Sequence, residues 1–234
     1  MCLDANFLRG GLGKALRKMD RAVYDRFFEP RSGGGPSGLR DVPRPFVFRV
    51  VERSVAAGEP FDFGFHLFEV RDAPFGLLKQ AFQELAEVES VEGCELLRLP
   101  MDSDVEVTRA RVTFITPTEL KGADRPEFGV LFGRIRDRLS TLRAFYGNGP
   151  LGIDFKSMGE RASKIVMTRC EIAHVERERV SRRTGQRHSL GGFIGVAEYE
   201  GDLGEFIPYL EIARWTGVGR QTVWGKGEIV CETL

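Results

Sequence analysis

Two neighbouring stretches decide the fold, namely DVEVTRARVTFI at residues 104–115 and PEFGVLFGRIRDRLSTLRAFY at residues 126–146. The first alternates apolar and polar residues, which is typical of a β-strand with one buried face. The second repeats apolar residues every three or four positions, and this spacing predicts a long helix with one apolar side. The stripe consists of Phe128, Leu131, Phe132, Ile135, Leu139 and Leu142.

The chain after this helix completes a recognisable unit. The patterns predict strands over 164–180, 192–199 and 228–232, and a helix over 205–215. Together with the opening strand and helix, the order is strand, helix, strand, strand, helix, strand. This is the order of the ferredoxin-like βαββαβ fold. We therefore predict a C-terminal ferredoxin-like domain over residues 101–234.

The first half shows the same order without a clear opening strand. Helices are predicted over 6–24 and 75–88, strands over 44–51, 59–70 and 94–99, and a Gly/Pro-rich loop over about 30–45. In the second of these strands, Phe61, Phe63, Phe65 and Leu67 share one face. We predict an N-terminal domain over residues 1–100, and for the whole chain an α+β fold of tandem ferredoxin-like (RRM-like) domains.

The missing opening strand leaves an internal position of the first sheet unpaired, which is costly unless another segment fills it. The filler is an upstream segment, a stub formed by residues 1–6, or a strand from a partner chain. We therefore expect the chain to form homodimers. A strictly monomeric species across a wide concentration range in sedimentation would contradict this expectation.

The charges balance overall, with 34 Lys and Arg against 34 Asp and Glu. This argues against binding to polyanions over the whole surface and leaves room for a local basic face. Acidic residues gather in 84–106, whereas residues 177–187 carry Arg177, Arg179, Arg182, Arg183 and Arg187. A charge run is most often a solvated surface, so the basic one becomes informative only beside other features that suit phosphate.

The composition also bounds the compartment and the chemistry. The four cysteines have no CxxC spacing, which indicates reduced thiols and neither a zinc site nor a disulfide framework. No apolar run approaches the length of a membrane span, and the N-terminus has no secretion signal. We expect a cytoplasmic protein that needs no metal or cofactor and has no membrane partner.

The most specific motif is GVGRQTVWGKG at residues 217–227. Its glycines are Gly217, Gly219, Gly225 and Gly227, and they bracket a segment that contains Arg220, Gln221 and Trp224, with Lys226 between the last two. Glycines allow positive φ and let backbone N–H groups approach a phosphate closely. The spacing matches neither the Walker A loop nor GxGxxG. Taken alone, an ordinary turn between a last helix and an edge strand explains it equally well.

This loop resembles the GhGxxxxxGhG signature of the RAMP superfamily, although Lys226 takes a position that is usually apolar. Residues 179–183 and 190–195 are similar to the Arg/Ser-rich hairpin of the endoribonucleases that process precursor CRISPR RNA, the sixth Cas protein family. Residues 201–203 and 206–210 resemble the helix before that family's glycine loop, and residues 8–13 and 44–46 resemble its N-terminal region.

The resemblance implies metal-independent cleavage of CRISPR repeat RNA, in which a 2′-oxygen attacks the adjacent phosphate and leaves a cyclic phosphate. Arginine pairs bidentately with phosphate, and backbone and aromatic groups support RNA binding. The expected RNA contacts are Arg179, Arg182, Arg183, Arg187, Gly217, Gly219, Arg220, Gln221, Trp224, Gly225, Lys226 and Gly227. For Trp224, stacking on a base and packing under the loop are both open.

Catalysis of this kind needs a base and an acid. Many relatives place a histidine in or just after the first helix, but residues 1–65 contain none. The candidates are therefore His188 in the Arg-rich hairpin, with Tyr24 and Lys18 as alternatives. His66 is more typical of a structural role, and His174 is open. The alternative function is a catalytically inactive RNA-binding subunit that works with other CRISPR effector proteins. A dimer that binds a small ligand fits the Gly and Arg density poorly.

Overall fold

The structure is a computed structural model that describes residues 2–30, 42–56, 58–87, 106–176, 178–180, 187–189 and 191–234. Its residues group into two compact units. The first comprises Met1–Arg98, Ser140–Pro150 and Val223–Gly225, and the second comprises Leu99–Leu139, Leu151–Thr222 and Lys226–Leu234. The predicted domain boundary near residue 100 lies outside the described residues and stays a prediction. Two short segments from the second half of the sequence, Ser140–Pro150 and Val223–Gly225, group with the first unit.

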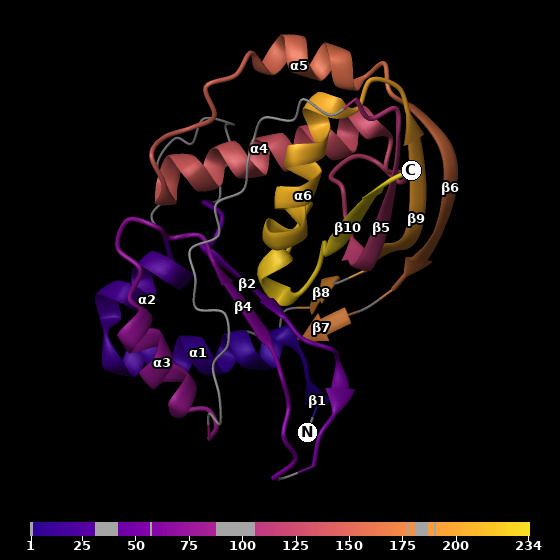
Figure 1. Cartoon of the computed structure of the whole chain (residues 1–234). Coiled ribbons are helices and arrows are strands. Elements are labelled where there is room, and N and C mark those ends of the chain that lie inside the picture. Colours follow the sequence, from indigo (N-terminus) through magenta and orange to yellow (C-terminus); the bar gives the residue numbers. More distant parts are fainter. Residues whose placement is uncertain are drawn as a thin grey trace. The chain divides into compact units, whose positions relative to one another are not determined.

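The second unit is built on a four-stranded antiparallel sheet (Figure 1). Its elements are β5 (Arg109–Thr118), most of α4 (Phe128–Tyr146), β6 (Val166–Val175), β9 (Gly192–Glu200), α6 (Ile207–Thr216) and β10 (Ile229–Thr233), while the end of α4 from Ser140 belongs to the first unit. The strands lie in the order β10-β5-β9-β6, so the first and third strands of the unit are central. This is the ferredoxin-like order, and the predicted fold is confirmed.

The core of this unit explains why the helix and strand patterns form these elements. On β5, Ala110, Val112 and Phe114 are buried, while the residues between them point to the other face. Five of the six residues in the predicted stripe of α4 pack in this same cluster, namely Phe128, Leu131, Phe132, Ile135 and Leu139. The alternation in β5 and the three-to-four spacing in α4 therefore mark the two apolar surfaces that pack against each other in the core.

Two features of the second unit differ from the sequence predictions. The unpredicted helix α5 (Phe155–Ala162) is short and depends on its cap, because the Asp154 carboxylate accepts hydrogen bonds from Lys156 N and Ser157 N at 3.1 and 3.0 Å. The long strand predicted over 164–180 is wrong. It ends at Val175, and β7 (Glu178–Val180) pairs with β8 (Arg187–Ser189) as a separate antiparallel hairpin. A short 3-10 turn at Gly204–Phe206 precedes α6.

In its described residues, the first unit contains four short strands and three helices. They are β1 (Cys2–Leu3), α1 (Ala5–Met19), α2 (Arg21–Phe28), β2 (Phe46–Arg49), β3 (Arg53–Ser54), β4 (Gly64–Leu67) and α3 (Phe75–Gln83). β1 pairs with β3, and β2 pairs with β4, both antiparallel. The strand predicted over 94–99 lies outside the described residues. Aromatic rings fill the core, with Phe27, Phe46 and Phe48 fully buried.

The opening strand of this unit exists as a two-residue stub. Cys2 and Leu3 pair with Ser54 and Arg53 in a two-stranded sheet that is separate from the sheet of β2 and β4, so the stub does not pair with either of those strands. The expectation of homodimers rested on an unpaired position and stays a prediction.

The single helix predicted over 6–24 is wrong, because Asp20 divides it. This residue has an extended backbone, with φ of -151°, and its N–H donates to Leu16 O to end α1. Its carboxylate then accepts hydrogen bonds from Ala22 N and Val23 N at 2.9 and 3.0 Å, which caps α2. Aspartate is a favoured N-cap residue, and here this local hydrogen bonding replaces a continuous helix.

A row of alternating charges crosses all four strands of the second unit, on the face opposite its core. Glu232, Arg111, Glu198 and Arg169 are successive register partners on β10, β5, β9 and β6. The Arg111 guanidinium donates twice to Glu198 Oε1, at 3.0 and 2.8 Å, and Arg169 lies 3.3 Å from the same oxygen. The hydrogen bond from Arg111 is the main cause that holds the pKa of Glu198 below its usual value.

We expect Glu198→Gln to lower the melting temperature at neutral pH, because the guanidinium groups of Arg109, Arg111 and Arg169 lose their shared counter-charge. Since the folded-state pKa of Glu198 is depressed, its stabilisation is present above the unfolded pKa and is lost as pH falls through the folded value. The difference in melting temperature between wild type and variant should therefore shrink below about pH 4.5. Thermal unfolding from pH 7 to pH 3 measures this. A difference that stays constant with pH would contradict the prediction.

Candidate nucleic-acid interface

The glycine loop has the backbone that its glycines predict. Gly217, Gly219, Gly225 and Gly227 have φ values of 71°, 81°, 83° and 72°, in the left-handed region that glycine enters readily. A Cβ at Gly227 would overlap the carbonyl oxygen of Val218. The loop in this form therefore needs hydrogen in place of a side chain.

Several N–H groups of the loop already have acceptors within the second unit. Val218 N donates to Gly227 O at 2.9 Å and closes the loop. Gly227 N donates to Pro117 O, and Arg220 N donates to Glu119 O, each at 3.1 Å. The end of β5 thus holds the loop at two points, and these amides are not open donors for phosphate.

The two cations of the loop have different surroundings. The Arg220 side chain is 60% exposed, and one of its nitrogens lies 2.7 Å from Glu119 Oε1. The Lys226 side chain is only 4% exposed, and its ammonium donates to Glu119 Oε2 at 3.4 Å, Gln221 Oε1 at 3.0 Å and Gly191 O at 2.5 Å. Burial lowers the pKa of Lys226, and Glu119 opposes that shift. Of the two, Arg220 reaches solvent and Lys226 is enclosed.

The remaining residues of the loop form a tight turn. Gln221 has φ of 63°, the only positive φ among the described residues other than glycine, and a 3-10 turn over Thr222–Trp224 follows. Trp224 is partly buried against the core of the first unit, and the guanidinium of Arg9 lies 5.8 Å from its ring centre. Trp224 thus packs against apolar residues of the first unit, and both its packing under the loop and its stacking on a base stay predictions.

The Arg-rich hairpin is described at its two strands. Arg179 of β7 lies opposite His188 of β8, and Val180 lies opposite Arg187. Arg182 and Arg183 lie outside the described residues. The pairing therefore places three predicted site residues, Arg179, Arg187 and His188, within one short ribbon.

Tyr24, the first alternative to a histidine, lies on α2 in the first unit. Its hydroxyl donates to Glu29 Oε1 at 3.1 Å, and its ring stacks on Phe28 with centres 5.2 Å apart. The guanidinium groups of Arg17 and Arg21 lie 5.8 and 5.1 Å from the ring centre. The phenol therefore sits in a cationic environment with a carboxylate as its partner.

Lys18, the second alternative, extends from α1 into solvent and pairs with Glu84 at 3.3 Å. The structure also places the two other histidines. His66 lies on β4, where it is partly buried, and His174 lies exposed on β6, with its ring 6.2 Å from that of Phe193. Neither His66 nor His174 is among the described partners of Arg220 and Lys226 or in the β7–β8 hairpin.

The decisive observation is a match between this region and a known family. Residues 112–229, half of the chain, match the family model described as CRISPR-associated endoribonuclease Cas6. The chain belongs to the Cas6 family. The matched range contains both the hairpin and the whole glycine loop. Residues 3–99 match a second model, which is described as an N-terminal domain.

Solved structures of Cas6 proteins agree in fold. A product complex of a Thermus thermophilus Cas6 is 15% identical, covers 97% of this chain and 93% of that chain, and has a TM-score of 0.63. A second Cas6 product complex is 17% identical, with coverage of 98% and 93% and a TM-score of 0.59. At these identities the likeness shows the fold alone, which is a tandem of ferredoxin-like domains. No curated protein sequence matches the chain.

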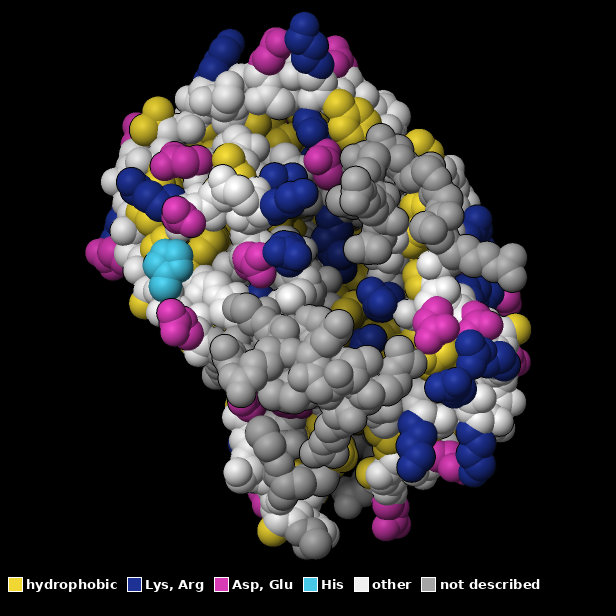
Figure 2. All heavy atoms as spheres, turned by 180° about the vertical axis from the view of Figure 1, so that it is seen from behind, with side chains coloured by type: hydrophobic (Ala, Val, Ile, Leu, Met, Phe, Trp, Pro, Cys, Tyr) yellow, Lys and Arg dark blue, Asp and Glu magenta, His cyan; other side chains and the backbone are white. Residues whose placement is uncertain are grey.

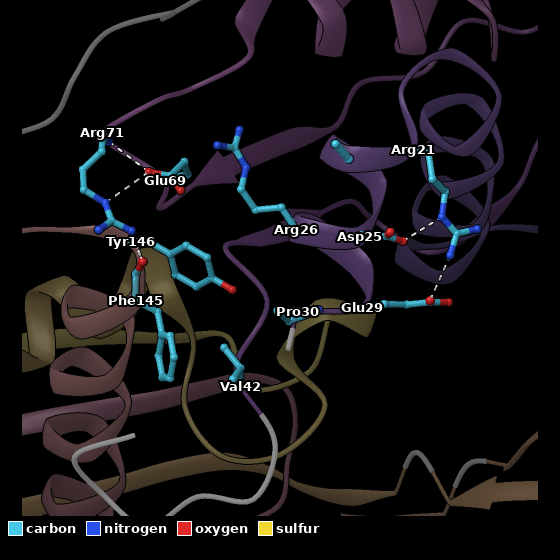
Figure 3. A pocket seen from close by; sticks show the side chains of 11 residues that line it. Arg21, Asp25, Arg26, Glu29, Pro30, Val42, Glu69, Arg71, Phe145 and Tyr146 are labelled. Atoms are coloured by element: carbon cyan, nitrogen blue, oxygen red, sulfur yellow. Dashed lines mark hydrogen bonds and ion pairs between the residues drawn. The ribbon is translucent and has the colours of Figure 1, made fainter. Parts of the chain in front are cut away.

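Within this Cas6 chain, sequence reasoning missed a hollow of about 640 Å³ in the first unit (Figure 3). It is lined by Arg21, Ala22, Asp25, Arg26, Glu29, Pro30, Val42, Glu69, Arg71, Phe145 and Tyr146. Arg21 pairs with Asp25 and Glu29, at 2.8 and 3.4 Å. Burial raises the pKa of Tyr146 to about 12. The lining comes from segments far apart in the chain, so no local pattern could reveal it.

The surface of this Cas6 chain mixes both signs of charge. Figure 2 shows Lys and Arg side chains interspersed with Asp and Glu across the face in view. In the described ranges, no group of three His, Cys, Asp or Glu side chains could hold a metal ion. No helix of these ranges has the length and apolar character that a membrane crossing requires.

Proposed function

We propose that this Cas6-family protein is a metal-independent endoribonuclease that binds CRISPR repeat RNA and cleaves it to make guide RNAs. The observation that carries the proposal is the family match over the hairpin and the glycine loop, whose conformation leaves one exposed arginine, Arg220. The Cas6 product complexes that share the fold support RNA as the substrate class.

The reaction is a transesterification within the RNA. The 2′-oxygen forms a bond to the adjacent phosphorus as the bond from phosphorus to the 5′-oxygen breaks. A base takes the 2′ proton, an acid protonates the leaving 5′-oxygen, and cations stabilise the charge on the phosphate. The products are a 2′,3′-cyclic phosphate and a 5′-hydroxyl, and the reaction needs neither water nor metal.

The residues of this chain supply the candidate groups. We assign acid–base work to His188, with Tyr24 and Lys18 as the alternatives. Phosphate contacts fall to the arginines of the hairpin and to Arg220, with the glycine loop shaping the surface around them.

Arg220→Ala is expected to weaken RNA binding by about tenfold and to reduce the slope of log affinity against log salt by about one, because one phosphate contact is lost. Filter binding of a repeat RNA at several salt concentrations measures both quantities. Arg214→Ala, on α6 beside Trp215 and outside the proposed interface, is the control. An unchanged slope would remove Arg220 from the phosphate contacts.

A second function has specific support, namely an RNA-binding subunit without catalysis, which works with other CRISPR effector proteins. Residues 1–65 contain no histidine, and the two alternatives in that region, Lys18 and Tyr24, already pair with Glu84 and Glu29. The two functions differ in one measurable property, cleavage of bound RNA.

The test is incubation of the purified protein, in EDTA, with end-labelled CRISPR repeat RNA. A parallel RNA carries a 2′-deoxy nucleotide at the cut position. Cleavage at one site that the 2′-deoxy substitution abolishes supports the nuclease. Tight, salt-sensitive binding without cleavage supports the RNA-binding subunit instead. Absence of both binding and cleavage contradicts both functions.

A further inference from the structure

The enclosed ammonium of Lys226 has an unexpected set of partners. It donates to Gln221 within the glycine loop and to Gly191 O, just before β9 and two residues after the hairpin strand β8 ends. Its third partner, Glu119 Oε2, follows the end of β5, and the other oxygen of that carboxylate holds Arg220. One buried cation therefore joins three backbone segments.

The same end of β5 also supports both neighbouring segments directly. Gly227 N donates to Pro117 O, and Glu228 N donates to Thr116 Oγ1 at 2.9 Å, so the loop returns along this strand. On the other side, Gly192 packs so closely on Thr118 that a Cβ there would collide with its backbone. The glycine loop and the start of β9 are thus both held at the end of β5, and Lys226 connects the two segments through its hydrogen bonds.

We infer that Lys226 is a positioning residue that holds the glycine loop and the base of the Arg-rich hairpin in fixed relation, and that it does not contact RNA. The inference deepens the proposed function and rests on it for its RNA readout. It replaces the sequence-based expectation that Lys226 binds phosphate. A lysine with its ammonium enclosed and bonded to three oxygens has no donor directed at solvent.

Lys226→Arg separates the two roles. Arginine is the better phosphate ligand, so a direct contact would survive or strengthen. In the enclosed site, the three oxygens converge on the single ammonium nitrogen of Lys226, and the larger planar guanidinium of arginine cannot take that position. We expect RNA affinity to fall about tenfold, since misplacement of the loop and hairpin weakens several contacts together. Lys156→Arg, at an 88% exposed lysine of α5, is the matched control and should bind as wild type does.

Glu119→Gln is the second variant, in case the Lys226 variant does not fold. Removal of a carboxylate beside two cations would tighten RNA binding if the effect were one of charge alone. If the contact between Glu119 and Lys226 positions the loop, its loss should instead weaken RNA affinity by severalfold. Wild-type affinity in a folded Lys226→Arg protein, or tighter binding by Glu119→Gln, would overturn the inference.

Hydrogen exchange without RNA provides a readout that is independent of function. Both variants should speed exchange in two regions together, at the amides of residues 218–227 and of residues 191–195, while the amides of α5 stay unchanged. Faster exchange in both regions supports the positioning role of Lys226 even if wild type fails to bind RNA, in which case the proposed function alone fails. Faster exchange in the loop alone overturns the coupling.

Discussion

Gly227→Ala is expected to destabilise the protein by about 2–4 kcal/mol, the range for a side chain forced into an incompatible backbone. Gly227 has φ of 72°, and a Cβ there would overlap the carbonyl oxygen of Val218, the residue whose N–H donates to Gly227 O and closes the loop. Neither group can move alone, because Val218 N and Gly227 N both donate backbone hydrogen bonds. We expect RNA affinity to fall by about tenfold at a temperature where the variant is still folded, as for Arg220→Ala, because the loop that carries Arg220 loses its shape.

Urea unfolding and RNA binding measure the two effects in parallel. Gly133→Ala is the matched control in the same unit, since Gly133 lies in α4 with no atom near the position of a new Cβ. Alanine there should stabilise the helix by about 0.5–1 kcal/mol and leave RNA binding unchanged. Equal stability of the two variants would show that the loop does not need its left-handed glycine.

His188→Ala is expected to slow metal-free cleavage of repeat RNA by about 10²–10⁴-fold, the range for loss of a general acid or base. RNA affinity should stay within about threefold of wild type, because the neighbouring arginines provide most of the attraction to phosphate. His188 lies opposite Arg179 on the short ribbon that also carries Arg187. The backbone register therefore pairs His188 with one of the arginines that are expected to contact phosphate.

Single-turnover cleavage in EDTA, with saturating protein, separates the chemical step from binding. His174→Ala is the control, since this histidine lies exposed on β6 and outside the hairpin. A wild-type rate for His188→Ala would remove it from the chemistry. Tyr24→Phe would then be the informative variant, because it deletes only the hydroxyl that donates to Glu29.

Local patterns predicted much of the second unit. The alternation in β5 and the apolar stripe of α4 arise from burial on one face, and this requirement acts on residues close together in the chain. The glycines of the loop also revealed their role, because left-handed backbone is a property of single residues. The break at Asp20 was within reach of local reasoning too, since an aspartate inside an apolar pattern is a helix-cap signal.

Other features depend on partners distant in the sequence. The stub Cys2–Leu3 is a strand only because Arg53 and Ser54 lie beside it. The helix α5 is too short for its apolar periodicity to be recognised in the sequence. The hollow of the first unit likewise forms only where α2, the segment after β4 and the last residues of α4 supply its walls.

Arg220 and Lys226 show most clearly the difference between what local sequence predicts and what contacts distant in the sequence decide. By itself, the sequence determined the ferredoxin-like order of the second half and the glycine backbone of the loop, because periodic burial and φ preference act locally. It placed Arg220 and Lys226 together as phosphate ligands, since both carry one positive charge in one short motif. Only the tertiary structure separated them, because Glu119 and Gly191 come from elsewhere in the chain and enclose one cation while the other stays in solvent.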